Sequence, residues 1–264
     1  MALKAAIRKI VPPLIMDAYR ALRPRPIWAG VYPCFSAVPT TEISRQGNAW
    51  LTAAVDPAGY STLPADVLQE HGYLAMLAAH LCRQNDGHLR ILDVGGALGV
   101  SYVHLLHTLT DCGGIDYHIV ELEWACREGA RRFADDRRLH YHRTLPESLS
   151  DLDIIHLTEA LEYVEDYAGL LRRLCAYRPQ YLLLVGLHAG SFPTYATAQL
   201  NIPGAIIPHW FFNLDEILEI LRACGYGPVF KGADGSLVDQ GGFPEAYRLP
   251  GGRALVLLFA RVER

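Results

Sequence analysis

The sequence predicts an α/β fold with a mostly parallel sheet of seven strands, and two observations support this. From about residue 90 onward, short apolar runs alternate with helical segments, which is the pattern of successive βαβ units. One of these runs enters a glycine-rich turn that opens a helix, as the first unit of such folds often does. The expected strands are Arg90–Val94, Tyr117–Glu121, Leu139–His142, Asp153–Leu157, Tyr181–Leu187, Val229–Lys231 and Ala254–Val262.

Helices fit between these strands. One is expected to open at Gly99, and the last is the best marked, because Asn213 can cap its start and Gly225 can end it. This last helix is expected at Leu214–Cys224, and the two before it at Trp124–Ala134 and Tyr167–Ala176.

Two parts of the chain do not follow the βαβ alternation. Residues 1–89 carry proline, glycine and aromatic residues before a helix expected at Pro64–Arg83, so we interpret them as an N-terminal arm and helical cap. The ligand-binding domain is then residues 90–264. Within it, the stretch at about 187–212 is too long for an ordinary connection and is expected to cover the substrate.

Composition excludes several classes of protein. The 264 residues carry a formal net charge of −4 and are 51% hydrophobic, which is typical of a globular protein and unlike the basic excess of nucleic-acid binders. No apolar run approaches the ~20 residues of a transmembrane helix. The six cysteines form no C-x-x-C pair, so we expect them to be reduced and the protein to be cytoplasmic.

The first 25 residues are basic, with six Lys and Arg against Asp17. A secretory signal is not expected, because Pro12 and Pro13 interrupt the apolar run. Two interpretations stay open: an amphipathic arm that makes weak contact with a membrane surface of anionic lipid, and a helix packed on the domain with its basic face in solvent.

The most informative stretch is Ile91–Gly99, an apolar strand followed by a glycine-rich turn. Gly95 and Gly99 allow a tight turn and close approach of a ligand to the backbone, while the following helix offers free N–H groups. Asp93 ends the strand, where it would bind an ammonium group or fix the amides of the turn and would repel a pyrophosphate. Glu121 ends the second strand and could accept both hydroxyl protons of a ribose. Together they predict a ribose-bearing, cationic ligand without phosphates, a description that S-adenosylmethionine meets.

Other enzyme classes lack their residues. A dinucleotide fingerprint needs glycine where the chain has Ala97 and Val100, so an NAD site fits poorly. A nucleophile elbow, a P-loop and paired cysteine ligands are also absent from the sequence, which leaves no residues to assign to hydrolase or kinase chemistry.

Motifs along nearly the whole chain carry a family resemblance. They are Ile10–Pro13, Tyr19-Arg20, Trp28–Tyr32, Gly59–Ser61, Leu92–Gly99, Val120-Glu121, Leu161–Val164, His209–Phe212 and Gly225-Tyr226. With these motifs the chain resembles the class I S-adenosylmethionine-dependent methyltransferases, and within them a bacterial methyltransferase-like family associated with surface-polysaccharide and natural-product gene clusters. Most class I members have glycine in place of Ala97.

The resemblance implies a Rossmann-like sheet, S-adenosylmethionine as cofactor and a set of contacts. It implies that Gly96 joins Asp93, Gly95 and Gly99 in the loop beside the methionine part of the cofactor and that Glu121 binds the ribose, with Glu123 as its rival. The remaining implied cofactor residues are Leu145, near the adenine, and Thr158, after the fourth strand.

Methyl transfer to oxygen or nitrogen needs a positioned acceptor and often a base. We expect His188, which follows the fifth strand, to be that base, although a loop histidine bonded to backbone is an equally good interpretation. The further catalytic candidates are Glu159, Tyr195 and His209, and Glu159 could instead cap a helix or pair with an arginine. For the aromatic run Trp210–Phe212, packing in the core is favoured over a role in the acceptor pocket.

Two histidine pairs raise the question of a metal. His140 and His142 share one face of a strand, and His104 and His107 share one face of a helix. Neither pair has a third ligand at a convincing spacing, so we expect no metal.

The sequence therefore predicts a cytoplasmic, S-adenosylmethionine-dependent enzyme that methylates oxygen or nitrogen of a small molecule in a biosynthetic pathway. Two alternatives stay open: an enzyme that cyclises S-adenosylmethionine to azetidine-2-carboxylate with release of methylthioadenosine, and a non-catalytic binding module with the same fold. The sequence does not indicate an oligomeric state.

Overall fold

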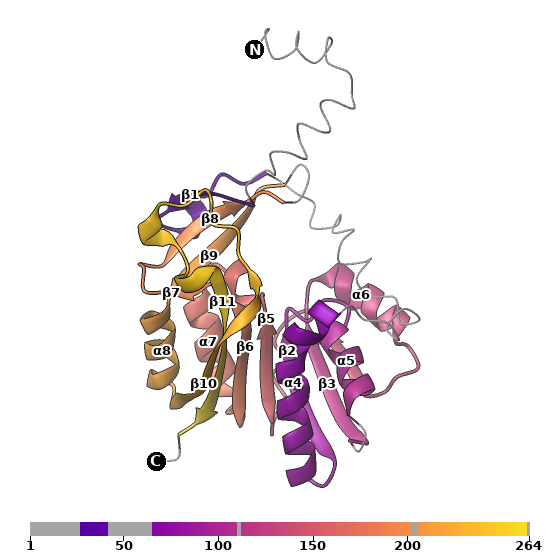
Figure 1. Ribbon diagram of the computed structural model, residues 1–264. Helices are drawn as coiled ribbons and strands as arrows, with labels where there is room; N and C mark the ends of the chain where they lie inside the picture. The colour runs from indigo at the N-terminus through magenta and orange to yellow at the C-terminus, as the bar shows by residue number, and fades with distance from the viewer. Residues whose placement is uncertain (1–26, 42–64, 110–111, 202–204, 263–264) are drawn as a thin grey trace, which may run out of the picture.

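The computed structural model describes residues 27–41, 65–109, 112–201 and 205–262. A large sheet of seven strands has the order β10-β11-β6-β5-β2-β3-β4 (Figure 1). β11 is antiparallel to both its neighbours and the other pairs are parallel. This confirms the predicted mostly parallel α/β sheet. The strands are β2 (His88–Val94), β3 (Gly114–Val120), β4 (Leu139–His142), β5 (Ile154–Thr158), β6 (Tyr181–Leu187), β10 (Tyr226–Leu237) and β11 (Arg253–Arg261).

Helices cover both faces of this sheet. Successive residues of β2 point to opposite faces of the sheet. Ile91 packs in the apolar cluster that contains residues of α4, α5 and α6, and Leu92 packs in the one that contains residues of α7 and α8. The Asn213 side chain accepts a hydrogen bond from Glu216 N–H at 3.1 Å, which confirms the expected cap. The helices are α4 (Ala65–Gln84), α5 (Val100–Thr108) and α6 (Glu123–Arg132) on one face, and α7 (Tyr167–Ala176) and α8 (Leu214–Ala223) on the other.

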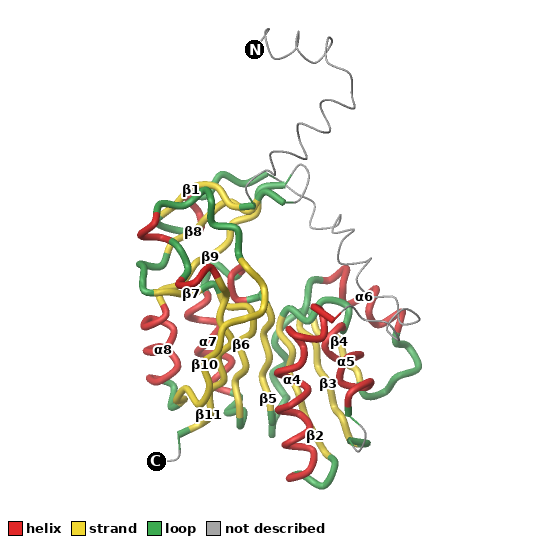
Figure 2. Tube along the Cα trace, in the orientation of Figure 1, coloured by secondary structure: helices red, strands yellow, loops and turns green. Residues whose placement is uncertain are grey.

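A second, four-stranded sheet lies beyond the carboxyl end of β6 (Figure 2). Its order is β1-β8-β9-β7, and we call it the cap sheet. The insertion expected after β6 supplies three of the strands, while β1 comes from the N-terminal segment and pairs antiparallel with β8. The strands are β1 (Trp28–Tyr32), β7 (Ala189–Gly190), β8 (Tyr195–Gln199) and β9 (Ile207–Asn213).

Two further expectations concern one strand of the large sheet and the N-terminal cap. The short strand expected at Val229–Lys231 is the middle of the twelve-residue β10, which pairs with β11 over most of its length. The basic arm and the start of the expected helical cap lie outside the described residues. α4, which carries the rest of that helix, buries Leu74 and Leu81 against the large sheet. Short 3₁₀ turns occur at Phe35–Ala37, Leu161–Tyr163, Glu245–Tyr247 and Pro250–Gly252.

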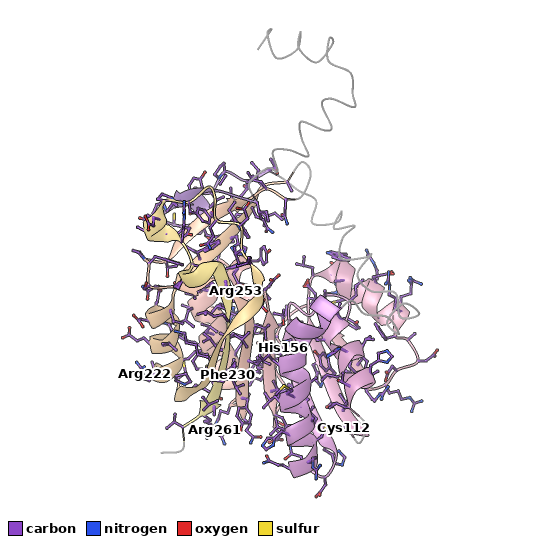
Figure 3. The ribbon with its side chains drawn as sticks, in the orientation of Figure 1. Cys112, His156, Arg222, Phe230, Arg253 and Arg261 are labelled. Carbon is purple, nitrogen blue, oxygen red and sulfur yellow. A yellow bond between two sulfur atoms is a disulfide. The ribbon has the colours of Figure 1, made fainter. Side chains whose placement is uncertain are left out.

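The expectation of six reduced cysteines is wrong for one pair. Cys82 at the end of α4 and Cys112 before β3 form a disulfide, with their Cα atoms 5.8 Å apart (Figure 3). The two residues are 30 positions apart, a separation that carries no spacing signal for the pairing. Among the described residues, none of the helices is long and apolar enough to cross a membrane.

Candidate functional site

The glycine-rich turn connects β2 to α5 and uses left-handed backbone at three positions. The φ angles are 79° at Gly95, 50° at Ala97 and 97° at Gly99. A Cβ atom on Gly95 would lie 2.5 Å from the Ala160 Cβ, so this position needs glycine for both its backbone angle and its space. Gly99 starts α5 without a side-chain cap, which leaves the first N–H groups of the helix available to a ligand.

Asp93 is buried beneath this turn and joins three strands. Its Oδ2 accepts a hydrogen bond from the Tyr117 hydroxyl at 2.7 Å, and its Oδ1 lies 3.1 Å from His156 Nδ1. The other ring nitrogen of His156, labelled in Figure 3, lies 2.8 Å from the Thr158 hydroxyl. A Cβ atom on Gly96 would lie 2.5 Å from Asp93 Oδ2. Asp93 therefore connects the turn to β3 and β5.

His156 is the member of this network that the sequence reasoning missed. It is fully buried in the middle of a strand whose other residues before Thr158 are apolar. A histidine at an inward position of a buried strand needs a polar partner, and that requirement was the available signal.

The two rival acids occupy different surroundings. Glu121 directly follows the last residue of β3, and its Oε2 accepts a hydrogen bond from Leu122 N–H at 3.0 Å. Glu123 lies in the first turn of α6 and pairs with Arg143 at 3.2 Å. Because the strand ends at Val120, Glu123 does not continue the strand face on which Glu121 was placed.

The turn and Glu121 lie at the point where the order of the sheet reverses. β2 lies between β5 and β3, and the chain leaves it first toward β4 and later toward β6. Open α/β sheets bind ligands at this point, outside the carboxyl ends of the strands. Thr158 ends β5 at this edge of the sheet. Leu145 lies in the loop after β4 and packs against the apolar cluster that contains residues of α7 and α8.

The carboxyl ends of β5 and β6 form a small hollow lined by Glu159, Glu162 and apolar residues. Glu159 has a left-handed φ of 47°, and it faces Gly186, where a Cβ atom would lie 2.5 Å from the Glu159 Cγ. Asp166, and not Glu159, caps α7.

Glu162 is 1% exposed, and burial raises its pKa to about 8, so it is protonated at neutral pH. Its Oε1 accepts the His188 backbone N–H at 3.1 Å.

His188 and His209 are brought together between the large sheet and the cap sheet. Their ring centroids are 4.9 Å apart, and His188 stacks on Phe211 while His209 contacts Trp28. Burial lowers the pKa of His188 to about 4 and that of His209 well below its usual value. Both imidazoles are therefore neutral near pH 7. Neither Nδ1 atom has a hydrogen-bond partner among the described residues.

Tyr195 lies beside this pair in a structural position. Its hydroxyl donates to the Tyr247 carbonyl oxygen at 2.7 Å, and its ring stacks on Phe211. Trp210 and Phe212 are buried in the apolar cluster between the large sheet and α7 and α8, as expected of core residues, whereas Phe211 lies in a smaller cluster with Trp28 and Tyr195.

A family model supplies the decisive comparison. The model described as a methyltransferase domain matches residues 67–229, which include the glycine-rich turn, Glu121 and both candidate histidines. The chain belongs to this methyltransferase family. No curated protein matches the sequence.

Several solved methyltransferase structures are similar to this chain at low identity. Magnesium protoporphyrin IX methyltransferase from Synechocystis PCC 6803 with bound S-adenosylhomocysteine is 14% identical, with a TM-score of 0.51 over 83% of this chain and 95% of that chain. The same enzyme with bound S-adenosylmethionine has a TM-score of 0.50 at 13% identity, over 83% and 92%. The Burkholderia thailandensis 1,6-didemethyltoxoflavin N1-methyltransferase is 19% identical, over 79% and 92%, with a TM-score of 0.46.

These findings confirm the class I, Rossmann-like fold and the expectation of an S-adenosylmethionine-dependent methyltransferase. The narrower bacterial family and the roles of the individual site residues stay predictions.

Proposed function

We propose that this protein transfers the methyl group of S-adenosylmethionine to an oxygen or nitrogen atom of a small-molecule acceptor. The observation that carries the proposal is that Glu121 and the uncapped start of α5 both adjoin one glycine-rich turn, whose Gly95 N–H donates to the Val120 carbonyl oxygen, at the point where the sheet order reverses. A carboxylate suits the two hydroxyls of a ribose, and helix N–H groups suit the carboxylate of a methionine. When bound, the cofactor supplies an electrophilic methyl group on a sulfonium.

The chain's own groups have distinct parts in this proposal. Gly95 and Gly99 keep the turn free of side chains, and Asp93 fixes the turn through Tyr117 and His156. The cap sheet encloses the acceptor and excludes water. Most of the rate enhancement then comes from holding the acceptor in line with the methyl group, which can supply ~7–11 kcal/mol.

His188 is our proposed proton acceptor in this reaction. Its backbone is fixed by Glu162 and by Phe212, whose N–H donates to the His188 carbonyl oxygen at 2.8 Å, and its ring is neutral because burial lowers its pKa. A neutral imidazole whose Nδ1 has no hydrogen-bond partner among the described residues is able to take a proton from an acceptor hydroxyl or amine, although a pKa of about 4 makes it a weaker base than a free histidine. Glu159 and His209 flank the same region and are the next candidates.

The resemblance to a bacterial family associated with surface-polysaccharide and natural-product gene clusters favours a biosynthetic acceptor. The match to a methyltransferase family favours methyl transfer over cyclisation of the cofactor and over a non-catalytic role.

Calorimetric binding of S-adenosylmethionine tests the proposed site. Glu121→Ala removes a carboxylate that would make two charge-assisted bonds, each worth ~1.5–3 kcal/mol, so affinity should fall at least about tenfold. Glu123→Ala is the matched control, because it removes an acid two residues away that pairs with Arg143, and its affinity should stay within twofold. Equal affinities for Glu121→Ala and the parent, with a large loss for Glu123→Ala, would reject the assignment.

A further inference from the structure

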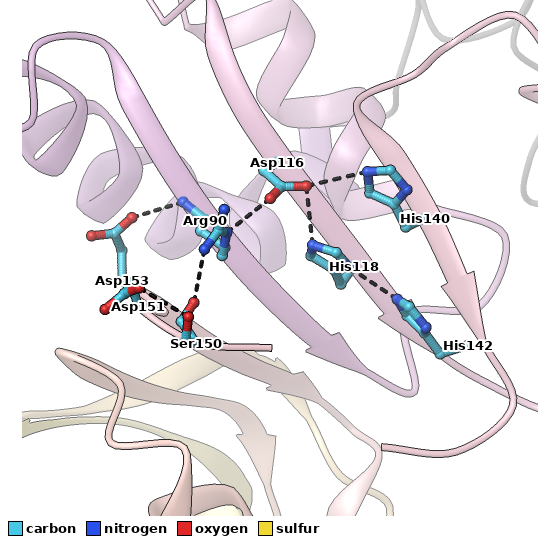
Figure 4. Close-up of polar contacts among 8 residues, drawn as sticks. All are labelled: Arg90, Asp116, His118, His140, His142, Ser150, Asp151 and Asp153. Atoms are coloured by element: carbon cyan, nitrogen blue, oxygen red, sulfur yellow. Dashed lines mark hydrogen bonds and ion pairs between the residues drawn. The ribbon is translucent and has the colours of Figure 1, made fainter. Parts of the chain in front are cut away.

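A cluster of polar side chains lies on one face of the two strands β3 and β4, away from the residues described above. Ile115, Tyr117 and Ile119 of β3 point into the core, so Asp116 and His118 point to the opposite face. The parallel register places His140 beside His118 and His142 beside Val120. Figure 4 shows Asp116, His118, His140 and His142 gathered on this face.

The distances in the cluster match those of a metal site. Asp116 Oδ1 lies 3.0 Å from His118 Nε2 and 3.2 Å from His140 Nε2, and the three donor atoms all lie within 4.8 Å of one another. Zinc binds such atoms at ~2.0–2.2 Å with tetrahedral angles, which separates neighbouring ligand atoms by ~3.2–3.6 Å. The three side chains therefore need only small movements to surround one ion.

The contact between His118 and Asp116 is short but poorly aligned. His118 Nε2 is buried and lies 3.0 Å from Asp116 Oδ1, yet the pair lacks the geometry of a good hydrogen bond. An ion between the two groups would use the lone pair of this nitrogen and a lone pair of the carboxylate together.

His142 and Arg90 hold the proposed ligands in place, as outer partners do around a metal ion. His118 Nδ1 lies 2.9 Å from His142 Nε2, so that a proton on Nδ1 would leave Nε2 free to coordinate. Arg90 Nε donates to Asp116 Oδ2 at 2.8 Å, which orients the other carboxylate oxygen toward the histidines. Ligands of metal ions in proteins are commonly held by such contacts.

We propose that Asp116, His118 and His140 bind a zinc ion, with a fourth position open to solvent. Two imidazoles and a carboxylate are a donor set that zinc favours, and side-chain exposures of 33% at Asp116 and 43% at His140 leave access for the ion and a water. Sequence spacing pairs His140 with His142 without a third ligand; in the fold His140 instead joins Asp116 and His118 of the neighbouring strand. The ion would tie the edge strand β4 to β3.

The site is separate from the proposed cofactor site and does not depend on it. His118 is three residues before Glu121, which corresponds to ~10 Å along an extended strand. The end of β4 leads into the loop that carries Leu145, so the ion would also steady the start of the loop expected near the adenine.

Metal titration of the full-length chain tests the proposal. The chelator-treated protein is titrated with Zn²⁺ by calorimetry and with Co²⁺ by visible absorption, which reports coordination geometry directly. We expect one equivalent of Zn²⁺ and the intense Co²⁺ bands of a four-coordinate site. His140→Asn should weaken Zn²⁺ binding by at least about 100-fold, and His142→Asn, which removes an outer partner, by ~10–100-fold.

His107→Asn is the matched control, because His107 is an exposed histidine in the last turn of α5, far from this strand face in the fold. It should leave Zn²⁺ affinity within twofold. Asp116→Asn provides a second ligand variant, and thermal unfolding of each chelator-treated variant shows that it is folded. Failure of the parent protein to bind one equivalent, or equal weakening by His107→Asn and His140→Asn, would overturn the proposal. Methyl transfer does not enter any of these measurements.

Discussion

Gly95→Ala tests whether the glycine-rich turn has the shape that the structure gives it. Two costs add at this position. The φ of 79° is left-handed, which costs an alanine ~1–2 kcal/mol, and the new Cβ would lie 2.5 Å from the Ala160 Cβ, an overpacking that typically costs a further ~1–3 kcal/mol. We expect a loss of about 2–5 kcal/mol in the free energy of unfolding, or ~2–4 °C in Tm for each kcal/mol. The affinity for S-adenosylmethionine should fall at least about tenfold, because the displaced turn borders the proposed site.

Gly225→Ala separates the two costs. Gly225 has a similar φ of 87°, but a Cβ there has no atom within 4 Å, so only the ~1–2 kcal/mol backbone cost applies. Its cofactor affinity should be unchanged. The double variant Gly95→Ala with Ala160→Gly should recover part of the loss, because it removes the opposing methyl group. Denaturant unfolding and calorimetry measure both quantities. Equal losses for Gly95→Ala and Gly225→Ala, or no recovery in the double variant, would refute the close approach of the turn to Ala160.

Three further predictions concern neighbouring residues. Ala97→Gly should raise the free energy of unfolding by about 0.5–1 kcal/mol in denaturant experiments, because glycine relieves a left-handed φ of 50° at some entropic cost; a destabilised variant would contradict this. The pKa of Glu162 is about 8 in the folded chain, and its usual value is 4.5. Between these two pH values the folded chain keeps a proton that the unfolded chain has lost. The contribution of Glu162 to the free energy of unfolding therefore falls by ~1.4 kcal/mol per pH unit as pH rises. The stability of Glu162→Gln relative to the parent should therefore increase from pH 5 to pH 8, and parallel curves would argue against a buried, protonated Glu162. His188→Ala should bind cofactor normally and turn over ~10²–10⁴-fold more slowly. Tyr195→Phe loses only the hydrogen bond to the Tyr247 carbonyl oxygen and should keep its rate. A rate loss below about tenfold for His188→Ala would place the base elsewhere.

The large sheet could be predicted from the sequence because its information is local. Tyr181–Leu187 and Leu139–His142 match their strands residue for residue, since each is an apolar or alternating run between breakers. The glycine-rich turn and Glu121 could also be placed, because their positions follow from where two strands end.

The cap sheet could not be predicted, because its pairing is not local. Trp28 pairs with Gln199 across most of the chain, and no short-range pattern specifies that register. Similarly, Asp116 joins His118 and His140 only because β3 and β4 are parallel in a particular register, and His156 meets Asp93 only because β5 lies beside β2. The disulfide between Cys82 and Cys112 has the same origin, in the packing of α4 against the large sheet.

The most direct test of the central claim follows the methyl group itself. Purified protein is incubated with methyl-labelled S-adenosylmethionine and a bacterial small-molecule extract, and both the sulfur product and the labelled fraction are identified by mass spectrometry. The proposed function predicts S-adenosylhomocysteine together with label in a small molecule, and Glu121→Ala should reduce both at limiting cofactor while Glu123→Ala does not. Release of methylthioadenosine, or a cofactor that binds but stays unconsumed across a broad set of extracts, would contradict methyl transfer as the activity of this site.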